Sequence, residues 1–439
     1  MFLIYTILYC LVAAVLLPFE YLKRPAPVRK RWLKEKFGIT GLPASQQSLP
    51  SLWVHAVSMG EVIAAVPFIR EVRRRHPSLR IVLSTITDTG QQVAQERLSG
   101  STDIIYLPFD VPLILRRLIT TIRPLVFIAM ETELWPNVFR VLHKEGTAVL
   151  VMNARLSDRS FRGYRRIRFF MKAVLRSVDM FCAQEEAYAA RIRALGVDED
   201  RVRVTGNFKF DTRPAGDLPE WSEILRGPVI LAGSTHPGEE ELVLSVLERL
   251  RRDFPDLNLV LAPRHPERFG EVERLIKEKG LPYVKRSESS DPTRPGIADS
   301  QRTTQNPEPK IVILDTIGEL ASAYGLCDVA VIGGSFTRRG GQNPLEPASW
   351  GKAIVCGPHM ENFPFITDFY REGAALRTGE EGLYETLREL IGSAEKRNAM
   401  GEKAKALSLA RGGAISRSAD VLERYLEGHF PLSQKEPLP

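Results

Sequence analysis

Cysteine and histidine are scarce in this chain, and neither is grouped in the way that a metal site or a disulfide framework requires. The 439 residues include four cysteines and seven histidines. The cysteines stand far apart, without a CxxC pair or a neighbouring set of histidines. This spacing excludes a cysteine zinc site and a disulfide scaffold, and it indicates small apolar core residues in a reducing compartment. The four are Cys10, Cys182, Cys327 and Cys356.

Charge is absent from residues 1–19, which form a nearly continuous apolar run. As a helix, about 20 such residues span a hydrocarbon core of about 30 Å, so the run is at the lower edge of a transmembrane length. Basic residues follow the run directly, and none precedes it. Positive charge on the C-terminal side alone predicts an uncleaved membrane anchor helix over residues 1–20, with the rest of the chain in the cytoplasm.

Seven basic residues form a collar behind this run: Lys23, Arg24, Arg29, Lys30, Arg31, Lys34 and Lys36. The collar supplies much of the formal net charge of +7. Nucleic acid is one partner for such charge, but anionic lipid headgroups attract each nearby Lys or Arg by about 1 kcal/mol. Because the collar adjoins the apolar run, we expect a membrane partner and no nucleic acid. Lys30, Arg31, Lys34 and Lys36 are expected near the headgroups.

Short apolar runs alternate with helical patterns along the rest of the chain, as is typical of buried parallel strands. The runs are 52–57, 80–85, 103–108, 125–130 and 148–153, then 229–232, 257–262, 311–314, 329–332 and 353–356. This pattern predicts an α/β fold with two Rossmann-like domains that face a cleft. We expect the domains at 21–212 and 228–425, joined by a linker at 213–227. The polar stretch 286–310 has almost no apolar residues and predicts a mobile loop.

A glycine-rich turn follows the strand predicted at 329–332. Four glycines lie between residues 333 and 341, ahead of a predicted helix start. Glycine lets backbone N–H groups approach a ligand, a helix N-terminus attracts phosphate, and Glu346 can accept hydrogen bonds from ribose hydroxyls. The turn therefore indicates a nucleotide site, although an ordinary tight turn with a buried Glu cap has the same pattern.

Several short motifs occur in one order along most of the chain. They are WVHAVSMGE at 53–61, METELWPN at 130–137, NARLS at 153–157, TGNFKFD at 205–211, APRHP at 262–266 and GGQNPLEP at 340–347. In these motifs the chain resembles the 3-deoxy-D-manno-octulosonic acid (Kdo) transferases. That family has the GT-B glycosyltransferase fold and attaches Kdo from CMP-Kdo to the lipid A precursor at the inner membrane.

The resemblance implies a role for each motif residue. Glu61 corresponds to the family's base, and Glu131 and Lys209 to its two transition-state groups. The implied CMP contacts are Pro263, Arg264, Ile317, Gly318, Glu319, Asn343, Pro344, Leu345 and Glu346. The resemblance further implies inverting transfer of Kdo to lipid IVA in lipopolysaccharide core biosynthesis. The first domain would then bind the acceptor and the second CMP-Kdo, on the cytoplasmic side of the inner membrane.

Elementary chemistry agrees with the catalytic roles, but each residue also has an ordinary alternative. A sugar hydroxyl has a pKa far above 7, so a carboxylate such as Glu61 must take its proton as the new bond forms. We expect the helix N-terminus to favour ionised Glu61 by about 0.3–1 kcal/mol; the alternative is a helix cap. Glu131 follows a buried strand, where a salt-bridged core carboxylate is equally common. Lys209 can neutralise the donor carboxylate or the departing phosphate, or it can be a solvated surface residue.

The donor site is expected to need no metal ion. CMP carries one phosphoryl group, which positioned cations and helix dipoles can neutralise, and no DxD-like pair occupies a predicted cleft position. Arg264 has the fork that matches a phosphate, although a surface salt bridge is its ordinary alternative. The histidines near strand ends, His55, His236, His265 and His359, are most simply core or surface residues.

Three functions remain open at this point. The first is a membrane-anchored Kdo transferase. The second is another GT-B enzyme at the membrane, such as a UDP-sugar-dependent transferase or epimerase, which a preference for UDP over CMP would reveal. The third is an inactive nucleotide or lipid binder, which the joint presence of Glu61, Glu131 and Lys209 opposes.

Overall fold

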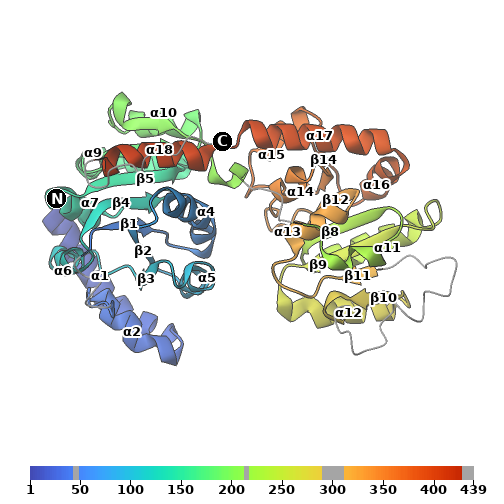
Figure 1. Cartoon of the computed structure of the whole chain (residues 1–439), viewed down its shortest axis with the longest axis horizontal. Helices are drawn as coiled ribbons and strands as arrows, with labels where there is room; N and C mark the ends of the chain where they lie inside the picture. The colour runs from blue at the N-terminus through green and yellow to red at the C-terminus, as the bar shows by residue number, and fades with distance from the viewer. Residues whose placement is uncertain (43–48, 212–216, 289–310, 428–439) are drawn as a thin grey trace. The chain divides into compact units, whose positions relative to one another are not determined.

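The computed structural model describes residues 1–42, 49–211, 217–288 and 311–427, and these form two compact units (Figure 1). Unit 1 contains Met1–Asp211 and the segment that begins at Gly412, and unit 2 contains Thr212–Arg411. Each unit is built on its own parallel seven-stranded sheet. The prediction of an α/β fold with two Rossmann-like domains is therefore confirmed.

The sheet of unit 1 has the strand order β3-β2-β1-β4-β5-β6-β7. Its strands are β1 (Ser51–His55), β2 (Arg80–Thr85), β3 (Asp103–Tyr106), β4 (Pro124–Met130), β5 (Ala148–Ala154), β6 (Met180–Ala183) and β7 (Val202–Val204). The order reverses between β1 and β4, and ligands of open α/β sheets bind at the carboxyl ends of the strands at such a switch point.

Helices cover both faces of this sheet because its strands are apolar on both sides. Leu52 and Val54 of β1 point into one core and Trp53 into the other. The helices of unit 1 are α1 (Phe2–Lys23), α2 (Ala26–Lys36), α4 (Met59–Arg75), α5 (Asp88–Leu98), α6 (Pro112–Ile122), α7 (Pro136–Lys144), α8 (Asp158–Arg166), α9 (Arg168–Leu175), α10 (Glu186–Ala194) and α18 (Ala414–Leu426), with the short 3₁₀ helices η1 (Glu199–Arg201) and η2 (Phe208–Asp211).

The sheet of unit 2 has the order β10-β11-β9-β8-β12-β13-β14, with its switch point between β8 and β12. Its strands are β8 (Val229–Thr235), β9 (Asn258–Pro263), β10 (Tyr283–Lys285), β11 (Ile311–Ile313), β12 (Val329–Ile332), β13 (Ala353–Cys356) and β14 (Leu376–Arg377). The helices are α11 (Glu239–Leu250), α12 (Phe269–Glu278), α13 (Leu320–Ala323), α14 (Leu345–Ser349), α15 (Ile366–Arg371), α16 (Leu383–Gly392) and α17 (Ala394–Ala410), with 3₁₀ helices η3 (Glu220–Ile224), η4 (Pro266–Arg268), η5 (Arg286–Glu288) and η6 (Tyr324–Leu326).

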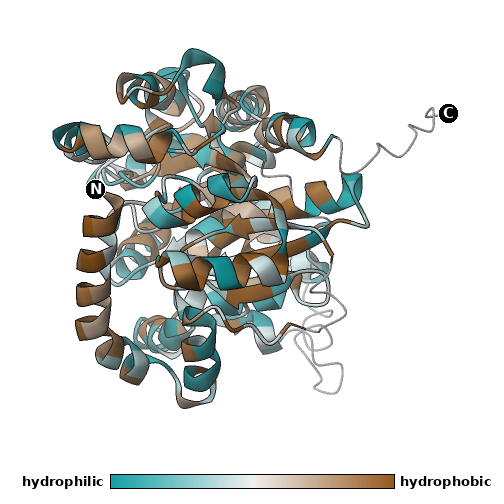
Figure 2. Ribbon diagram, turned by 90° about the vertical axis from the view of Figure 1, so that its left-hand side faces the viewer, coloured by the Kyte–Doolittle hydropathy of each residue, from teal (hydrophilic) through white to brown (hydrophobic). Residues whose placement is uncertain are grey.

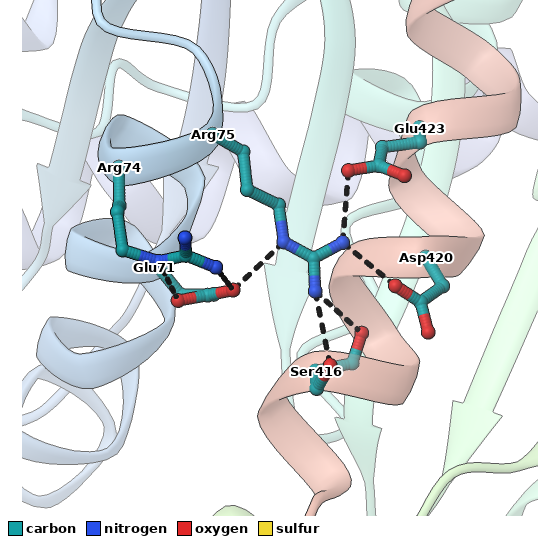
Figure 3. Close-up of polar contacts among 6 residues, drawn as sticks. All are labelled: Glu71, Arg74, Arg75, Ser416, Asp420 and Glu423. Carbon is teal, nitrogen blue, oxygen red and sulfur yellow. Dashed lines mark hydrogen bonds and ion pairs between the residues drawn. The ribbon is translucent and has the colours of Figure 1, made fainter. Parts of the chain in front are cut away.

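The last helix departs from the predicted domain boundaries, which place residues up to 425 in the second domain. Helix α18 belongs to unit 1, where Ile415 and Leu422 join the core beneath α4. Arg75 of α4 fixes this position through ion pairs with Asp420 at 2.6 Å and Glu423 at 2.8 Å, and it also donates to Ser416 (Figure 3). The sequence shows an amphipathic helix here but not which core receives it.

The predicted linker and loop lie only partly within the described residues. Residues 213–216 of the linker are outside them, and the rest of the linker packs on unit 2, where Trp221 is 5% exposed in the core beside β8 and β9. Residues 289–310 of the predicted mobile loop are also outside them. The start of that stretch forms η5, and Arg286 pairs there with Glu319 at 2.8 Å.

Helix α1 has the length and apolarity needed to cross a membrane, which makes it compatible with the predicted anchor. The collar behind it is less uniform than predicted. Lys30, Arg31 and Lys34 are exposed, but Lys36 is buried at 8% exposure, against the rings of Trp32 and Phe109. Burial lowers the pKa of Lys36 to about 8. The prediction that Lys36 reaches lipid headgroups is therefore wrong, because its side chain turns into the unit.

Candidate active site

Glu61 is in the first turn of α4, directly after β1. Ser58 caps the helix, and its Oγ accepts from the Glu61 N–H at 3.5 Å. The Glu61 carboxylate in turn accepts from the Val57 N–H at 2.9 Å and from the Ser58 hydroxyl at 3.2 Å. This reciprocal pattern is close to a capping box. Glu61 thus occupies the capping position that the sequence left open, which leaves its chemical role to be decided by its surroundings.

Those surroundings disfavour the charged form of Glu61. Its side chain is buried, at 9% exposure. Burial, reinforced by the nearby carboxylates of Glu131 and Glu133, raises its pKa to about 7. The expectation that the helix N-terminus keeps Glu61 ionised is wrong in its net direction, because desolvation and two like charges outweigh the dipole. A carboxylate with a pKa near neutrality suits general base chemistry.

Glu131 comes from the turn after β4, the strand next to β1. It has a left-handed backbone with φ of +55°, and its N–H donates to the Met152 carbonyl of β5 at 2.9 Å. A non-glycine residue in this region is strained, and such strain gathers at functional sites. Asn153 at the end of β5 has the same unusual φ of +55°. The strand ends around the switch point are thus held in defined, costly conformations.

Lys209 lies in η2, after β7. Asn207 accepts from the Lys209 N–H at 3.0 Å, and Asn153 accepts from the N–H of Phe208 at 3.1 Å. Burial lowers the pKa of Lys209, while the negative charge of Glu131 opposes that shift and the positive charge of Arg155 adds to it. The structure therefore brings Glu61, Glu131 and Lys209 into one electrostatically coupled site of unit 1.

Helix α18 supports the Lys209 segment from the other end of the chain. Phe208 shares a core with Ala414 and Ile415, and the carboxylate of Asp211 accepts from the backbone N–H groups of Gly413 and Ile415. Arg417 also donates to the Thr205 carbonyl at 2.9 Å. The turn that presents Lys209 is thus fastened to the helix that the sequence placed in the second domain.

The glycine-rich turn of unit 2 is organised by a residue that the sequence analysis did not assign. Glu239, 2% exposed at the start of α11, accepts from the N–H groups of His236 at 2.9 Å, Gly334 at 2.7 Å, Phe336 at 3.0 Å and Thr337 at 3.4 Å. The visible signal was the similarity of residues 232–239 to residues 55–61, each running from a strand through a small-residue turn to an acidic helix start.

This arrangement corrects, for three of the four glycines, the prediction that their N–H groups approach a ligand. The N–H of Gly334 is bound to Glu239, that of Gly333 donates to Gly233 at 2.8 Å and that of Gly341 donates to Gly334 at 2.9 Å. Helix α14 also has only five residues, so its dipole is small. The glycines serve close packing instead: a Cβ on Gly333 would be 2.3 Å from the Ser234 carbonyl oxygen.

The predicted nucleotide residues around α14 form a compact group. Asn343 accepts from the Leu345 N–H at 3.1 Å and donates to the Glu346 carboxylate at 3.3 Å, while Pro344 precedes the helix. Burial raises the pKa of Glu346, and the hydrogen bond from the Asn343 amide and the positive charge of Arg264 oppose that rise. Glu346 of α14 and Arg264, which follows β9, are therefore close enough to interact.

The remaining predicted contacts follow β9 and β11. Pro263 ends β9, and the exposed Arg264 is held by its N–H, which donates to Thr235 at 3.0 Å. After β11, Ile317 is 83% exposed and Gly318 has a φ of +95°. The Glu319 carboxylate is already engaged, since it accepts from Trp221 at 3.0 Å and pairs with Arg286.

Two of the histidines near strand ends have clear structural roles. His55 is fully buried, with Nδ1 bonded to Ser84 Oγ at 2.9 Å, and burial lowers its pKa to about 3. His236, 7% exposed, packs edge-on to His265 with ring centres 5.5 Å apart. Within the described ranges, no group of three or more His, Cys, Asp or Glu residues could hold a metal ion.

Comparison with known proteins places this site in a family. Residues 31–212 match the family model described as 3-deoxy-D-manno-octulosonic-acid transferase (kdotransferase). A 3-deoxy-D-manno-octulosonic acid transferase of Haemophilus influenzae is 32% identical over 411 residues, which cover 92% of this chain and 93% of that one. This chain belongs to the Kdo transferase family. It is therefore a glycosyltransferase.

Further relatives agree with this assignment. The Kdo transferase of Bordetella pertussis is 32% identical over 410 residues, covering 89% of this chain and 91% of that protein. Among solved structures, a UDP-N-acetylglucosamine 2-epimerase matches with a TM-score of 0.56 at 13% identity, covering 89% of this chain and all of that one. At this identity the likeness shows the shared GT-B fold of this Kdo transferase and nothing about its substrates.

Proposed function

We propose that this Kdo transferase moves Kdo from CMP-Kdo to a hydroxyl of the lipid A precursor, lipid IVA, with inversion at the anomeric carbon, in lipopolysaccharide core biosynthesis. The observation that carries the proposal is the Glu61 site of unit 1, where burial and two neighbouring carboxylates raise the pKa of Glu61 to about 7. Such a group is ionised often enough near neutral pH to accept a proton and basic enough to hold it.

In the proposed reaction the acceptor hydroxyl oxygen attacks the anomeric carbon of Kdo. The bond from that carbon to the phosphate oxygen breaks, and CMP leaves with the electron pair. Glu61 takes the hydroxyl proton as the new bond forms. A single displacement of this kind inverts the anomeric configuration.

Glu131 has two effects that fit this chemistry. Its charge raises the pKa of Glu61 and also opposes the burial that lowers the pKa of Lys209. The same carboxylate thus makes the base stronger and keeps the lysine cationic. We assign Lys209 to neutralising the donor carboxylate or the departing phosphate, because a preorganised charge in a water-poor site stabilises developing charge efficiently.

The donor nucleotide is assigned to unit 2. The exposed guanidinium of Arg264 suits the CMP phosphate, and the Asn343 to Glu346 segment, with the half-buried carboxylate of Glu346, suits the ribose hydroxyls. Pro263 and residues 317–319 would complete the nucleotide contacts. The acceptor's acyl chains would lie in a bilayer, and we assign the reaction to the cytoplasmic face of the inner membrane, where α1 would hold the enzyme.

Product analysis tests this proposal directly. The full-length enzyme is incubated with lipid IVA vesicles and CMP-Kdo in excess, and the lipid product is followed by mass spectrometry while released CMP is measured. We expect a mass increase of one or more Kdo residues and CMP in equal amount, with the anomeric configuration of the product opposite to that of the donor by NMR. Absence of Kdo product, together with preferential binding of UDP over CMP, would favour a different GT-B enzyme.

A further inference from the structure

Helix α1 does not project from unit 1 but lies along it (Figure 2). Its half-buried positions are 2, 5, 6, 9, 13, 17, 20 and 21. These recur every three or four residues, which is the period of one helix face. The opposite face carries large apolar side chains in solvent, including Leu3, Leu11 and Phe19 at 72%, 61% and 70% exposure. One face of α1 is thus partly covered along the helix, with no residue fully buried, and the other face is exposed.

The N-terminal end of α1 is held by buried polar groups. The Tyr5 hydroxyl donates to Asp110 at 2.7 Å, and Asn137 donates to the Thr6 hydroxyl at 2.9 Å. Asp110 and Asn137 are both fully buried. The ring of Phe2 also lies beneath the Arg140 guanidinium, 4.6 Å from its centre. Pulling this end away would strip partners from buried polar groups, at about 1–3 kcal/mol for each group left unsatisfied.

The C-terminal end of α1 is attached to the same unit. Arg24, which follows the helix and is 8% exposed, pairs with Asp88 of α5 at 2.6 Å and with Glu20 at 3.2 Å. Its guanidinium also lies over the Trp32 ring, 5.2 Å from the centre. A helix of 22 residues is about 33 Å long. With both ends bound to one folded unit, α1 cannot cross a bilayer in this arrangement.

Positive charge flanks both ends of α1, although the sequence shows it at one end only. At the C-terminal end are the exposed Lys30 and Lys34 of the collar. At the N-terminal end, a cavity of about 520 Å³ is lined by Met1 and by the exposed side chains of Arg165, Arg168, Lys172 and Arg176. In the described part of the chain no carboxylate forms an ion pair with these four. A spanning anchor would need its positive charge on one side of the membrane only.

We infer that α1 lies in the plane of the membrane, with its exposed apolar face in one leaflet of an anionic bilayer and both basic groups at the headgroups. Interfacial helices of this kind bury their apolar face about 5–10 Å into the boundary between headgroups and acyl chains. The inference rests on the membrane location proposed above, and it replaces the spanning orientation that the sequence suggested with a one-sided attachment.

Depth-dependent fluorescence quenching separates the two orientations. Cys10, which is exposed, is first replaced in a Cys10→Ser background, because Cys182, Cys327 and Cys356 are buried and should not label. A bimane label is then placed by Leu3→Cys, Leu11→Cys or Phe19→Cys on the exposed face, with Ala13→Cys on the covered face as the matched control. The full-length protein is bound to phosphatidylglycerol vesicles whose acyl chains carry bromine at a shallow or a deep carbon.

For an in-plane helix, the labels at 3, 11 and 19 should be quenched to similar extents and more strongly by shallow bromine, with the label at 13 quenched several-fold less. A maximum at 11 with deep bromine, and equal quenching at 11 and 13, would show a spanning helix and overturn the inference. Absence of quenching at every position would also overturn it and would indicate another partner, such as a second copy of the chain. Kdo transfer is assayed in the same samples, so that loss of activity with the in-plane pattern counts against the proposed function alone.

The basic groups at the two ends of α1 allow a second experiment. Neutralising Lys30 and Lys34 to Gln, or Arg168 and Lys172 to Gln, should each weaken co-sedimentation with anionic vesicles by up to about fivefold per charge, and less in high salt. Lys403→Gln, an exposed lysine of unit 2, is the control and should change nothing. Dependence on the collar pair with indifference to the Arg168 and Lys172 pair would contradict an in-plane helix.

Discussion

Two turns of this molecule look alike and behave differently. Glu61 follows β1 in unit 1, and Glu239 follows β8 in unit 2, each at the start of the helix after the first strand of its sheet. Both carboxylates are buried, and burial raises the pKa of both. Glu239 accepts from four backbone N–H groups, which oppose that rise. Glu61 has two donors, and two carboxylates beside it add to the rise.

The difference separates a carboxylate that the fold uses for its own hydrogen bonds from one that is suited to the proposed reaction. The hydrogen bonds of Glu239 tie the turn after β8 to the glycine turn after β12, and they partly offset the cost of burying its charge. The charge of Glu61 is left only partly compensated and is repelled by its neighbours. Protonation of Glu61 relieves this repulsion, so its carboxylate is suited to accept a proton as a general base does. Local fold alone does not distinguish the two residues.

The largest expected effect is on turnover. Glu61→Gln removes the base but keeps an oxygen that can accept from Val57, so the fold should persist while kcat falls by roughly two to four orders of magnitude. The measurement is CMP release with lipid IVA as acceptor, with folding checked by circular dichroism. Glu96→Gln, an exposed carboxylate of the same unit, is the control. Near-normal turnover in a folded Glu61→Gln variant would mean that Glu61 only caps helix α4.

The next effect is on the stability of unit 2. Glu239→Ala leaves four backbone donors without their acceptor and should lower the free energy of unfolding of this unit by about 3–5 kcal/mol. Hydrogen exchange at the amides of Gly334 and Phe336, together with urea denaturation, provides the measurement. Glu241→Gln, exposed on the same helix, is the matched control. A stability loss no greater than that of the control would mean that Glu239 does not hold the glycine turn.

A smaller effect concerns pH. The folded protein holds the Glu61 proton more tightly than the unfolded chain, so this residue's contribution to stability falls as pH rises from its ordinary pKa of 4.5 to about 7. Glu61→Gln should remove this loss. The free energy of unfolding of the variant should therefore rise by about 1–3 kcal/mol relative to that of the wild type between pH 5 and pH 8. A difference in unfolding free energy that is independent of pH would contradict the raised pKa.

The same pKa should govern the rate. We expect kcat/KM to rise with pH through an apparent pKa of about 7 as Glu61 ionises. Glu133→Gln removes one like charge and should move this limb to lower pH. Glu186→Gln, on the exposed start of α10, should leave the limb in place. An unchanged profile in Glu133→Gln would remove Glu133 from the charge cluster.

The smallest expected effect is that of metal removal. Because the charges of Lys209 and Arg264 are assigned to the donor, exhaustive treatment with EDTA should leave activity unchanged. A metal-dependent glycosyltransferase in the same buffer controls for chelation. Loss of activity that added magnesium restores would reveal a cation site and would weaken the role given to Lys209.

Much of the fold was predictable because its strands are long apolar runs. All ten predicted runs overlap observed strands, from β1 to β13. Four of the described strands escaped prediction: β7, β10 and β14 have only two or three residues, whereas β6 is a buried apolar run of four residues that the prediction missed. In β7, Arg203 and Val204 are exposed, and β14 is only Leu376 and Arg377. Such edge strands are set by their neighbours in the sheet and leave little pattern in the sequence.

The candidate site was predictable in its residues but not in its electrostatics. The family resemblance pointed to Glu61, Glu131 and Lys209, and the capping pattern around Ser58 was visible. The raised pKa of Glu61 was not, because it depends on burial in the folded unit and on Glu131 and Glu133, which follow a different strand. The basic residues beside the N-terminus of α1 were missed for the same reason, since residues 165–176 reach it only through the fold.

Because α18 is the last element described and packs on the first unit, unit 2 is in effect inserted into unit 1. During synthesis, unit 2 emerges complete while unit 1 still exposes the apolar surface that Ile415 and Leu422 will cover. Domains that emerge first fold first, so here the middle of the chain can fold before its beginning is finished. The segment bearing Lys209 gains its support from Ile415 only when α18 is made, and a ribosome that stops short of α18 would release a complete unit 2 with an unfinished unit 1.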